Sequence, residues 1–227
     1  MIQNYDFSED TNSDITPIIF TIGVLGKELV GLELGVMAGT SFMTLLHACP
    51  NIKTLYGIDN YKPYKDCITN PYTGNPVAIA DEKDAECHKF ITHHRIKYSG
   101  MKEKVIFYEE DSDEAIKKFK PQSLDFIFID TFMTYEQAVN DIRSWYPIVK
   151  DGGLFAGHDW SAYVIQKAVN EVRDEVEPDA VVMGYANCWG WIKNDVKKDT
   201  FPTKETTVSA SSEVVNDLLS YISASEN

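Results

Sequence analysis

Short apolar runs alternate with longer amphipathic stretches along most of the chain, which is typical of strands and helices that alternate around a parallel sheet. Seven runs predict strands, at residues 29–34, 54–58, 105–108, 124–129, 153–156, 180–183 and 188–192. Between the fourth and the fifth, apolar side chains recur at helical spacing over 135–146 and predict a helix that covers one face. We therefore expect an α/β fold, a Rossmann-like three-layer sandwich around a seven-stranded, mostly parallel sheet.

The last two predicted strands lie close together in the sequence. Only Gly184 to Asn187 separate them, which is too short for a crossover helix, so they should form an antiparallel hairpin at one sheet edge. Upstream, Asp151, Gly152 and Gly153 are expected to mark the end of the preceding helix.

Two segments do not follow the repeating pattern. Residues 61–100 contain a turn-rich part, 62–76, and a polar helical stretch, 81–98, which predict a lid or substrate-binding element or a crossover helix with a solvated loop. Residues 1–195 would then form one domain and 196–227 a linker with a final helix. That helix would carry an apolar stripe, which could pack on the domain or form a homodimer; the stripe comprises Val214, Val215, Leu218, Leu219 and Ile222.

Charge and composition restrict the partners. The 227 residues carry a formal net charge of −14, which argues against duplex nucleic acid and anionic membranes and favours a small or neutral substrate. The four cysteines are scattered without metal or disulfide spacing, so we expect reduced thiols. The first residues resemble no signal peptide and no segment is a membrane span, so a cytoplasmic protein is expected.

A glycine-containing turn after the first predicted strand is the strongest local motif. In the segment 32–41, Gly35 and Gly39 would let the backbone approach a ligand, and the following helix would present free amide groups to it. The spacing is not the G-x-G-x-x-G of dinucleotide enzymes, and the chain contains no G-x-x-x-x-G-K-[ST] loop.

Acidic residues follow the next two predicted strands. Asp59 ends the second strand, at the position where an acidic residue accepts hydrogen bonds from ribose hydroxyls. The third strand leads into Asp111 and Ser112, which could contact an adenine edge. The ends of three strands therefore predict a nucleoside site.

This order of motifs resembles the class I S-adenosylmethionine-dependent methyltransferases, especially methyltransferase family 24, over residues 29–192. The matching positions are 33–35 with 39–41, Asp59, Asp111-Ser112, 128–130, Tyr135-Glu136 with Asp141, Gly152-Gly153 and 157–159. The resemblance implies that the methionine part of S-adenosylmethionine is held by Glu33, Gly35, Gly39, Thr40 and Ser41. It further implies Asp59 for the ribose and Asp111 with Ser112 for the adenine, and Asp130 also belongs to the expected cofactor site.

Three residues are candidates for the chemistry. His158 is a candidate general base, and Asp130 with Asp159 could hold a divalent metal such as magnesium, as the resemblance to catechol-type O-methyltransferases implies. Trp160 stands where those enzymes have a further asparagine ligand. The family commonly has an Asp-His pair after its fourth-strand aspartate, whereas this chain has Thr131, Phe132 and Met133 (131–133), which predicts an apolar acceptor pocket or an altered activity.

The candidate residues also have purely structural interpretations. Asp130 could cap the following helix, and His158 could be a packing residue. Tyr61 could stack on adenine or lie in a surface loop, whereas Trp189 and Trp191 are expected in the hairpin core.

The expected function is therefore methylation of a hydroxyl group on a small metabolite or sugar. Two alternatives stay open at this point. An NAD-dependent oxidoreductase would share the first strand, the turn and the acidic residue for the ribose. A non-catalytic cofactor-binding module would keep the fold without methyl transfer.

Overall fold

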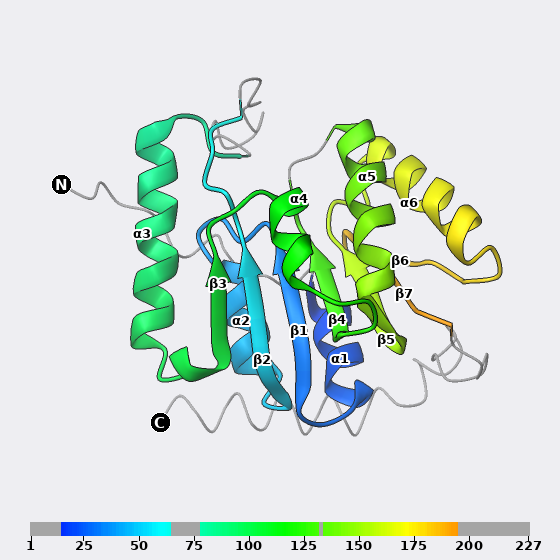
Figure 1. Cartoon of the computed structure of the whole chain (residues 1–227), viewed down its shortest axis with the longest axis horizontal. Coiled ribbons are helices and arrows are strands. Elements are labelled where there is room, and N and C mark those ends of the chain that lie inside the picture. Colours follow the sequence, from blue (N-terminus) through cyan, green and yellow to red (C-terminus); the bar gives the residue numbers. More distant parts are fainter. Residues whose placement is uncertain (1–14, 65–77, 132–133, 195–227) are drawn as a thin grey trace. The chain divides into compact units, whose positions relative to one another are not determined.

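The computed structural model describes residues 15–64, 78–131 and 134–194, and Figure 1 shows one sheet with helices on both faces. The strands are β1 (Leu29–Leu34), β2 (Ile52–Ile58), β3 (Val105–Tyr108), β4 (Leu124–Ile129), β5 (Val149–Gly157), β6 (Met183–Tyr185) and β7 (Cys188–Ile192). The helices are α1 (Thr16–Leu25), α2 (Thr40–Ala48), α3 (Glu82–Tyr98), α4 (Ser112–Ala115), α5 (Tyr135–Trp145) and α6 (Tyr163–Val176).

The sheet has the strand order β3-β2-β1-β4-β5-β7-β6. β1 pairs in parallel with both β2 and β4. The chain therefore adds β2 and β3 on one side of β1, and then β4 and β5 on the other side. Ligands of open α/β sheets bind outside the carboxyl ends of the strands at such a reversal. The topology therefore places the candidate site at the carboxyl ends of β1, β2 and β4.

The predicted α/β sandwich with its mostly parallel sheet is confirmed.

The terminal hairpin is also confirmed, although its first strand was predicted too early. β7 lies antiparallel to both β5 and β6. The strand expected at 180–183 is wrong, because β6 covers Met183–Tyr185 and includes Gly184. The turn consists of Ala186 and Asn187, which have φ angles of 50° and 65°. Two consecutive positive φ angles match the twist of a tight hairpin, so the connection is shorter than the four residues predicted.

Two apolar clusters fill the space between the sheet and its helices. On one face, Leu32 and Ile127 pack against Ile142 of α5 and Val169 of α6. On the other face, Phe126 and Phe128 belong to the cluster that contains Ile22 of α1 and Phe42 of α2. Ile127 and its neighbours at 126 and 128 point to opposite faces because side chains alternate along a strand.

One local prediction is wrong, and one helix was not predicted. Asp151, Gly152 and Gly153 do not mark the end of a helix, because α5 ends at Trp145 and β5 already starts at Val149. Gly152 has a φ of 78°, and the pairing of β4 with β5 shifts register between Leu124 and Phe126. The glycines therefore accommodate an irregularity within the strand. Helix α1 was not predicted, since its sequence is apolar on all sides and shows no helical periodicity.

The chain divides into one compact unit at Met1–Asn194 and a second at Asp195–Asn227, and every described residue belongs to the first. The expected linker and final helix lie outside the described residues, as do Phe132 and Met133. Within the described part of the chain, no helix has both the length and the apolar character needed to cross a bilayer.

Candidate functional site

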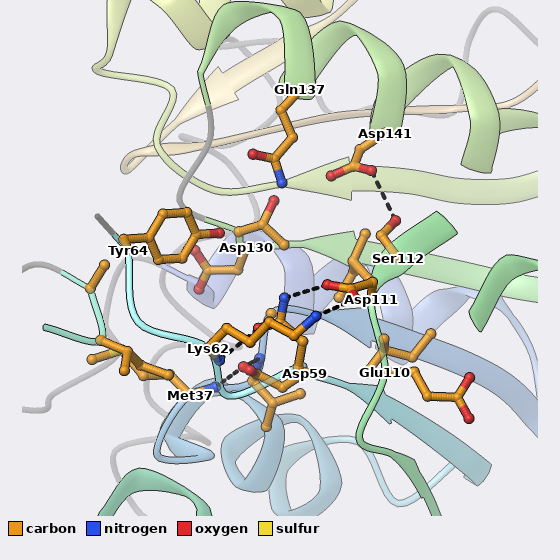
Figure 2. Close-up of a pocket in the computed structure, with 18 of the residues that line it drawn as sticks. Met37, Asp59, Lys62, Tyr64, Glu110, Asp111, Ser112, Asp130, Gln137 and Asp141 are labelled. Carbon is orange, nitrogen blue, oxygen red and sulfur yellow. Dashed lines mark hydrogen bonds and ion pairs between the residues drawn. The ribbon is translucent and has the colours of Figure 1, made fainter. Parts of the chain in front are cut away.

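A cavity of about 510 Å³ opens at the carboxyl ends of β1 to β4. Its volume lies in the range of small-molecule and cofactor sites, which is about 300–1,000 Å³. Figure 2 shows the side chains that surround it. Among the residues expected to hold a cofactor or to take part in the chemistry, the cavity lining includes Gly35, Thr40, Ser41, Asp59, Asp111, Ser112, Asp130 and Asp159. Glu33, Gly39 and His158 are not among the described lining residues.

The bend after β1 requires glycine at position 35. Gly35 has a φ of 84°, and a Cβ atom added there would lie 2.1 Å from the carbonyl oxygen of Asp130. That contact involves backbone, which cannot rotate away as a side chain would. Gly39, with a φ of 78°, is the N-cap of α2 and packs near Thr92 of α3. The glycines thus bring the loop against β4 and α3 and shape one wall of the cavity.

Asp59 fixes the conformation of this loop. Its Oδ2 accepts hydrogen bonds from the backbone amides of Val36 (2.9 Å) and Met37 (2.7 Å). Its Oδ1 accepts one from the backbone amide of Tyr61 at 2.7 Å. Asp59 therefore ties the end of β2 to the glycine loop. Oδ1 keeps one further lone pair, so the carboxylate can also accept one hydrogen bond from a ligand. Its expected contact with ribose stays a prediction.

Glu33 lies buried beside the loop and is fully inaccessible to solvent. The Ser41 hydroxyl donates a hydrogen bond of 2.5 Å to its Oε1, whereas Oε2 has no partner among the described residues. Burial raises the pKa of Glu33 well above its ordinary value, and the neighbouring Asp130 and Asp59 act in the same direction. Glu33 is therefore placed to support Ser41, which does line the cavity.

Asp111 connects β3 to the segment after β2. Lys62 Nζ lies 2.6 Å from Asp111 Oδ2, and Asn60 Nδ2 donates to Oδ1 at 2.7 Å. The hydrogen bonds from Lys62 and then Asn60 lower the pKa of Asp111. This ion pair is part of the cavity wall in Figure 2. The contact ties Lys62, near the start of the segment 61–100, to Asp111, which lies three residues after β3. Tyr64 and Ile79 of the same segment also line the cavity.

Ser112 belongs to a buried polar network that the sequence did not predict. The indole Nε1 of Trp145 donates to the Ser112 hydroxyl at 2.8 Å, and Ser112 donates to Asp141 Oδ1 at 2.8 Å. Asp141 is 2% exposed and lines the cavity. Burial is the main reason why its pKa rises to about 6, and nearby Asp113 adds to this. From the sequence, Asp141 was only a position that matches the family, because no local pattern indicates which strand end its helix reaches.

Asp130, His158 and Asp159 come together at the ends of β4 and β5. His158 Nδ1 lies 3.3 Å from an oxygen of Asp130 and 3.3 Å from an oxygen of Asp159. One ligand atom from each residue can be chosen so that all lie within 4.8 Å of one another. Asp159 has a φ of 61°, an uncommon conformation for a residue other than glycine. Both carboxylates line the cavity, with His158 in contact with each of them. Asp130 is not the cap of α5, whose N-cap is Thr134.

Three aromatic residues that were singled out from the sequence are placed by packing. Tyr61 is buried and stacks on Phe107, with ring centroids 6.1 Å apart. It is not a surface residue, so that predicted placement is wrong, whereas its expected contact with adenine stays a prediction. The indoles of Trp189 and Trp191 are buried in the core, as expected. Residues that line the cavity without having been singled out from the sequence include Lys62, Tyr64 and Gln137.

The cavity is strongly acidic. Its described lining contains seven carboxylates, from Asp59, Glu110, Asp111, Asp113, Asp130, Asp141 and Asp159. Lys62 is the one lysine or arginine of that lining, and it is already paired with Asp111. A ligand with positive charge and hydrogen-bond donors complements such a surface, whereas a phosphate would be repelled.

A seven-stranded sheet in this order, with an antiparallel β7 between β5 and β6 and a cavity at the carboxyl ends of β1 to β4, defines the class I methyltransferase fold. A family model described as a methyltransferase domain, Methyltransf_24, matches residues 32–160, which is more than half of the chain. The chain therefore belongs to this family of methyltransferase domains. Comparison with curated proteins gives no significant match.

Solved structures share this fold at low sequence identity. A protein of Corynebacterium glutamicum has a TM-score of 0.56 at 12% identity, and the match covers 81% of each chain. A protein of Klebsiella pneumoniae classed as an O-methyltransferase has a TM-score of 0.53 at 13% identity, over 81% of this chain and 80% of its own. One of Staphylococcus aureus classed as a caffeoyl-CoA O-methyltransferase has 0.51 at 15% identity, over 78% and 81%.

Proposed function

We propose that the chain is an S-adenosylmethionine-dependent methyltransferase that methylates a hydroxyl group of a small metabolite or sugar. One observation carries this proposal: the cavity is acidic, and the chain belongs to a family of methyltransferase domains. S-adenosylmethionine bears a sulfonium and an ammonium group, whereas NAD bears a negatively charged pyrophosphate. Seven carboxylates and one paired lysine complement the first ligand and disfavour the second. An NAD-dependent oxidoreductase is therefore the weaker interpretation.

The residues that line the cavity support a placement of the cofactor in the order that the family resemblance implies. Under this proposal the loop at Gly35 with Thr40 and Ser41 holds the methionine part, and Asp59 binds the ribose. Asp111 and Ser112 then lie at the adenine. The tight bend at Gly35 supports this placement, because a side chain there would collide with the backbone of Asp130 and close the approach to the loop.

The second half of the site would serve the acceptor. When bound, S-adenosylmethionine supplies an electrophilic methyl group on sulfur. The acceptor oxygen forms a bond to the methyl carbon, the carbon–sulfur bond breaks, and its electron pair remains on sulfur. The hydroxyl proton must leave, and we assign its removal to the carboxylates of Asp130 and Asp159. His158 Nδ1 lies 3.3 Å from an oxygen of each carboxylate and orients the two groups.

A divalent ion such as magnesium is a second means of activating the hydroxyl. Asp130, Asp159 and His158 could supply three ligands, because suitable atoms lie within 4.8 Å of one another. Carboxylate oxygens suit magnesium, and an imidazole nitrogen suits zinc better. Trp160 offers no ligand atom at the next position. A bound ion would lower the pKa of the acceptor hydroxyl.

Methyl transfer tests the proposal directly. The full chain is incubated with methyl-labelled S-adenosylmethionine and a small-metabolite extract, with and without a chelator. We expect label in a small molecule, and Asp159→Asn should lower the rate by about 100-fold or more while S-adenosylhomocysteine still binds. Loss of transfer on chelation assigns the metal route. Label confined to protein or nucleic acid contradicts the small-molecule acceptor, and cofactor binding without any transfer supports the non-catalytic module.

A further inference from the structure

Asp141 brings an unpaired oxygen to the cavity, next to the residue expected at the adenine. Its Oδ1 is occupied by the Ser112 hydroxyl, but Oδ2 has no hydrogen-bond partner among the described residues. The residue is 2% exposed, so water does not compensate for the missing bond. An unsatisfied buried acceptor costs about 1–3 kcal/mol, so it is uncommon unless a ligand completes it. In Figure 2 the second carboxylate oxygen of Asp141 points into the space between Gln137 and Ser112.

The direction of the hydrogen bonds around Ser112 is fixed. The indole of Trp145 can only donate, so the Ser112 oxygen must accept from it. The Ser112 proton is then directed to Asp141 Oδ1. Oδ2 is therefore left as a buried acceptor on a residue that lines the cavity. Burial raises the pKa of Asp141 to about 6, so the carboxyl is ionised at about pH 7.5 and attracts an N–H donor.

We propose that Asp141 is a specificity-determining residue that accepts a hydrogen bond from the exocyclic amino group of the cofactor's adenine. This inference rests on the proposed function, since it takes the end of β3 as the adenine subsite. The amino group offers only hydrogen-bond donors, and the ionised carboxylate of Asp141 offers only acceptors, so the two groups complement each other. Asp141 would then distinguish a 6-aminopurine from a 6-oxopurine.

Two ligands that differ at this one position test the proposal. S-adenosylhomocysteine carries the amino group, and S-inosylhomocysteine carries an oxygen in its place. By isothermal titration calorimetry of the full chain, we expect the first to bind at least ~10-fold more tightly, since the second leaves Asp141 facing a carbonyl oxygen. Equal dissociation constants overturn the proposal, and this comparison needs no variant that folds.

Asp141→Asn should reverse the preference. The arrangement that keeps both existing hydrogen bonds places the asparagine carbonyl on the Ser112 hydroxyl and turns its NH₂ group toward the cavity. That group repels an amino donor and donates to the 6-oxo group, so the affinity ratio should move by ~10-fold or more toward S-inosylhomocysteine. An unchanged ratio in a variant that binds either ligand overturns the proposal.

Asp113→Asn is the matched control. It removes the same charge from the neighbouring exposed carboxylate, which is in contact with Asn140 Nδ2 at 3.3 Å. It should change both affinities alike and leave their ratio within ~2-fold. If the wild-type chain binds neither ligand, the proposed function fails together with this inference. If it binds both equally, only the role of Asp141 fails.

Discussion

Individual carboxyl groups at the site differ in role because their surroundings differ. Asp59 accepts three backbone amides and holds the loop after β1. Asp111 is stabilised as an anion by Lys62, whereas Glu33 is buried with one oxygen unpaired. Desolvation raises the pKa of Glu33, whereas the hydrogen bond from the Lys62 ammonium group lowers the pKa of Asp111. The residue type alone therefore does not assign these roles.

At the residue scale, Glu33→Gln should make the protein more stable at neutral and alkaline pH. The carboxyl has an ordinary pKa of 4.5, and burial raises it well above that in the folded state. As pH rises above about 4.5, the unfolded chain ionises first, so the free energy of unfolding falls until the pH reaches the folded pKa. Glutamine has no such ionisation and can still accept from Ser41.

Thermal unfolding across pH measures this difference. At about pH 4 the midpoints of wild type and Glu33→Gln should be similar, and at about pH 8 the variant should unfold at least ~2 °C higher. Glu28→Gln, at an exposed ion pair with Lys53, is the control and should not change the pH dependence. Parallel pH profiles for wild type and Glu33→Gln would show that Glu33 is ionised in the fold.

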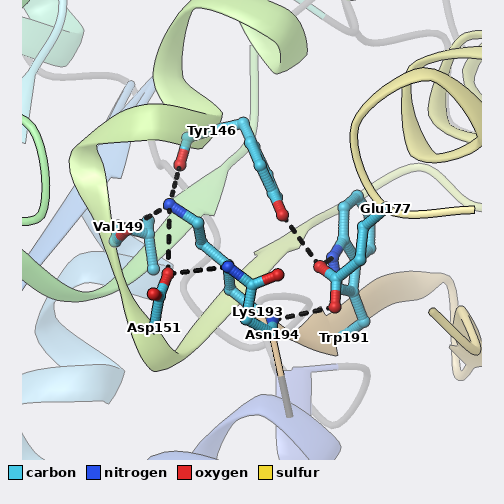
Figure 3. A network of polar contacts seen from close by, with 7 residues as sticks. All are labelled: Tyr146, Val149, Asp151, Glu177, Trp191, Lys193 and Asn194. Carbon is cyan, nitrogen blue, oxygen red and sulfur yellow. Dashed lines mark hydrogen bonds and ion pairs between the residues drawn. The ribbon is translucent and has the colours of Figure 1, made fainter. Parts of the chain in front are cut away.

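At the element scale, a polar network attaches β7 to the rest of the domain. In Figure 3, Lys193 donates to the carbonyl oxygens of Tyr146 (3.3 Å) and Val149 (2.7 Å). Glu177, after α6, accepts from the Tyr146 hydroxyl and the Trp191 indole. These contacts join the end of β7 to the start of β5 and the end of α6. The hairpin is thus held by side chains as well as by its strand pairing.

Lys193→Met should destabilise the fold by about 2–3 kcal/mol, because two buried carbonyl oxygens lose a charged donor. Lys193 is 5% exposed, so water cannot replace the ammonium group without local opening. Urea unfolding followed by circular dichroism measures the loss. Lys53→Met, whose side chain is 60% exposed in its ion pair with Glu28, should produce no measurable change. Equal midpoints for both variants would refute a stabilising role for Lys193.

At the scale of the whole molecule, the net charge of −14 and the acidic cavity act on the same ligand. S-adenosylmethionine carries one more positive charge than S-adenosylhomocysteine, because the product has lost the sulfonium. Its affinity should therefore include a larger Coulombic contribution, which salt screens.

Titrations in low and high salt check this expectation. Between about 50 and 500 mM NaCl, the dissociation constant of S-adenosylmethionine should rise at least ~3-fold more than that of S-adenosylhomocysteine. NAD should not bind measurably at either concentration. An identical salt response for the two cofactor forms would contradict an electrostatic role of the cavity carboxylates.

Local sequence determined most of the fold. Alternating strands and amphipathic helices, the glycine bend at Gly35 and the short connection before β7 are local features, so they predicted the sheet and the place of the site. Asp59, directly after β2, and Asp111, three residues after β3, were located in the same way. Local patterns failed where tertiary packing decides, as for the uniformly apolar α1 and for the limits of β6.

The roles of individual side chains were decided by the tertiary structure. Ser112 and Asp141 are 29 residues apart, and no spacing rule predicts their hydrogen bond. His158 contacts Asp130 only because the preceding residues, Gly157 of β5 and Ile129 of β4, are paired in the sheet. The sequence by itself determined the methyltransferase fold and the edge of the sheet that holds the site, because strand ends are set by local pattern. Burial, pKa and hydrogen-bond direction depend on neighbours distant in sequence, so only the fold could decide them.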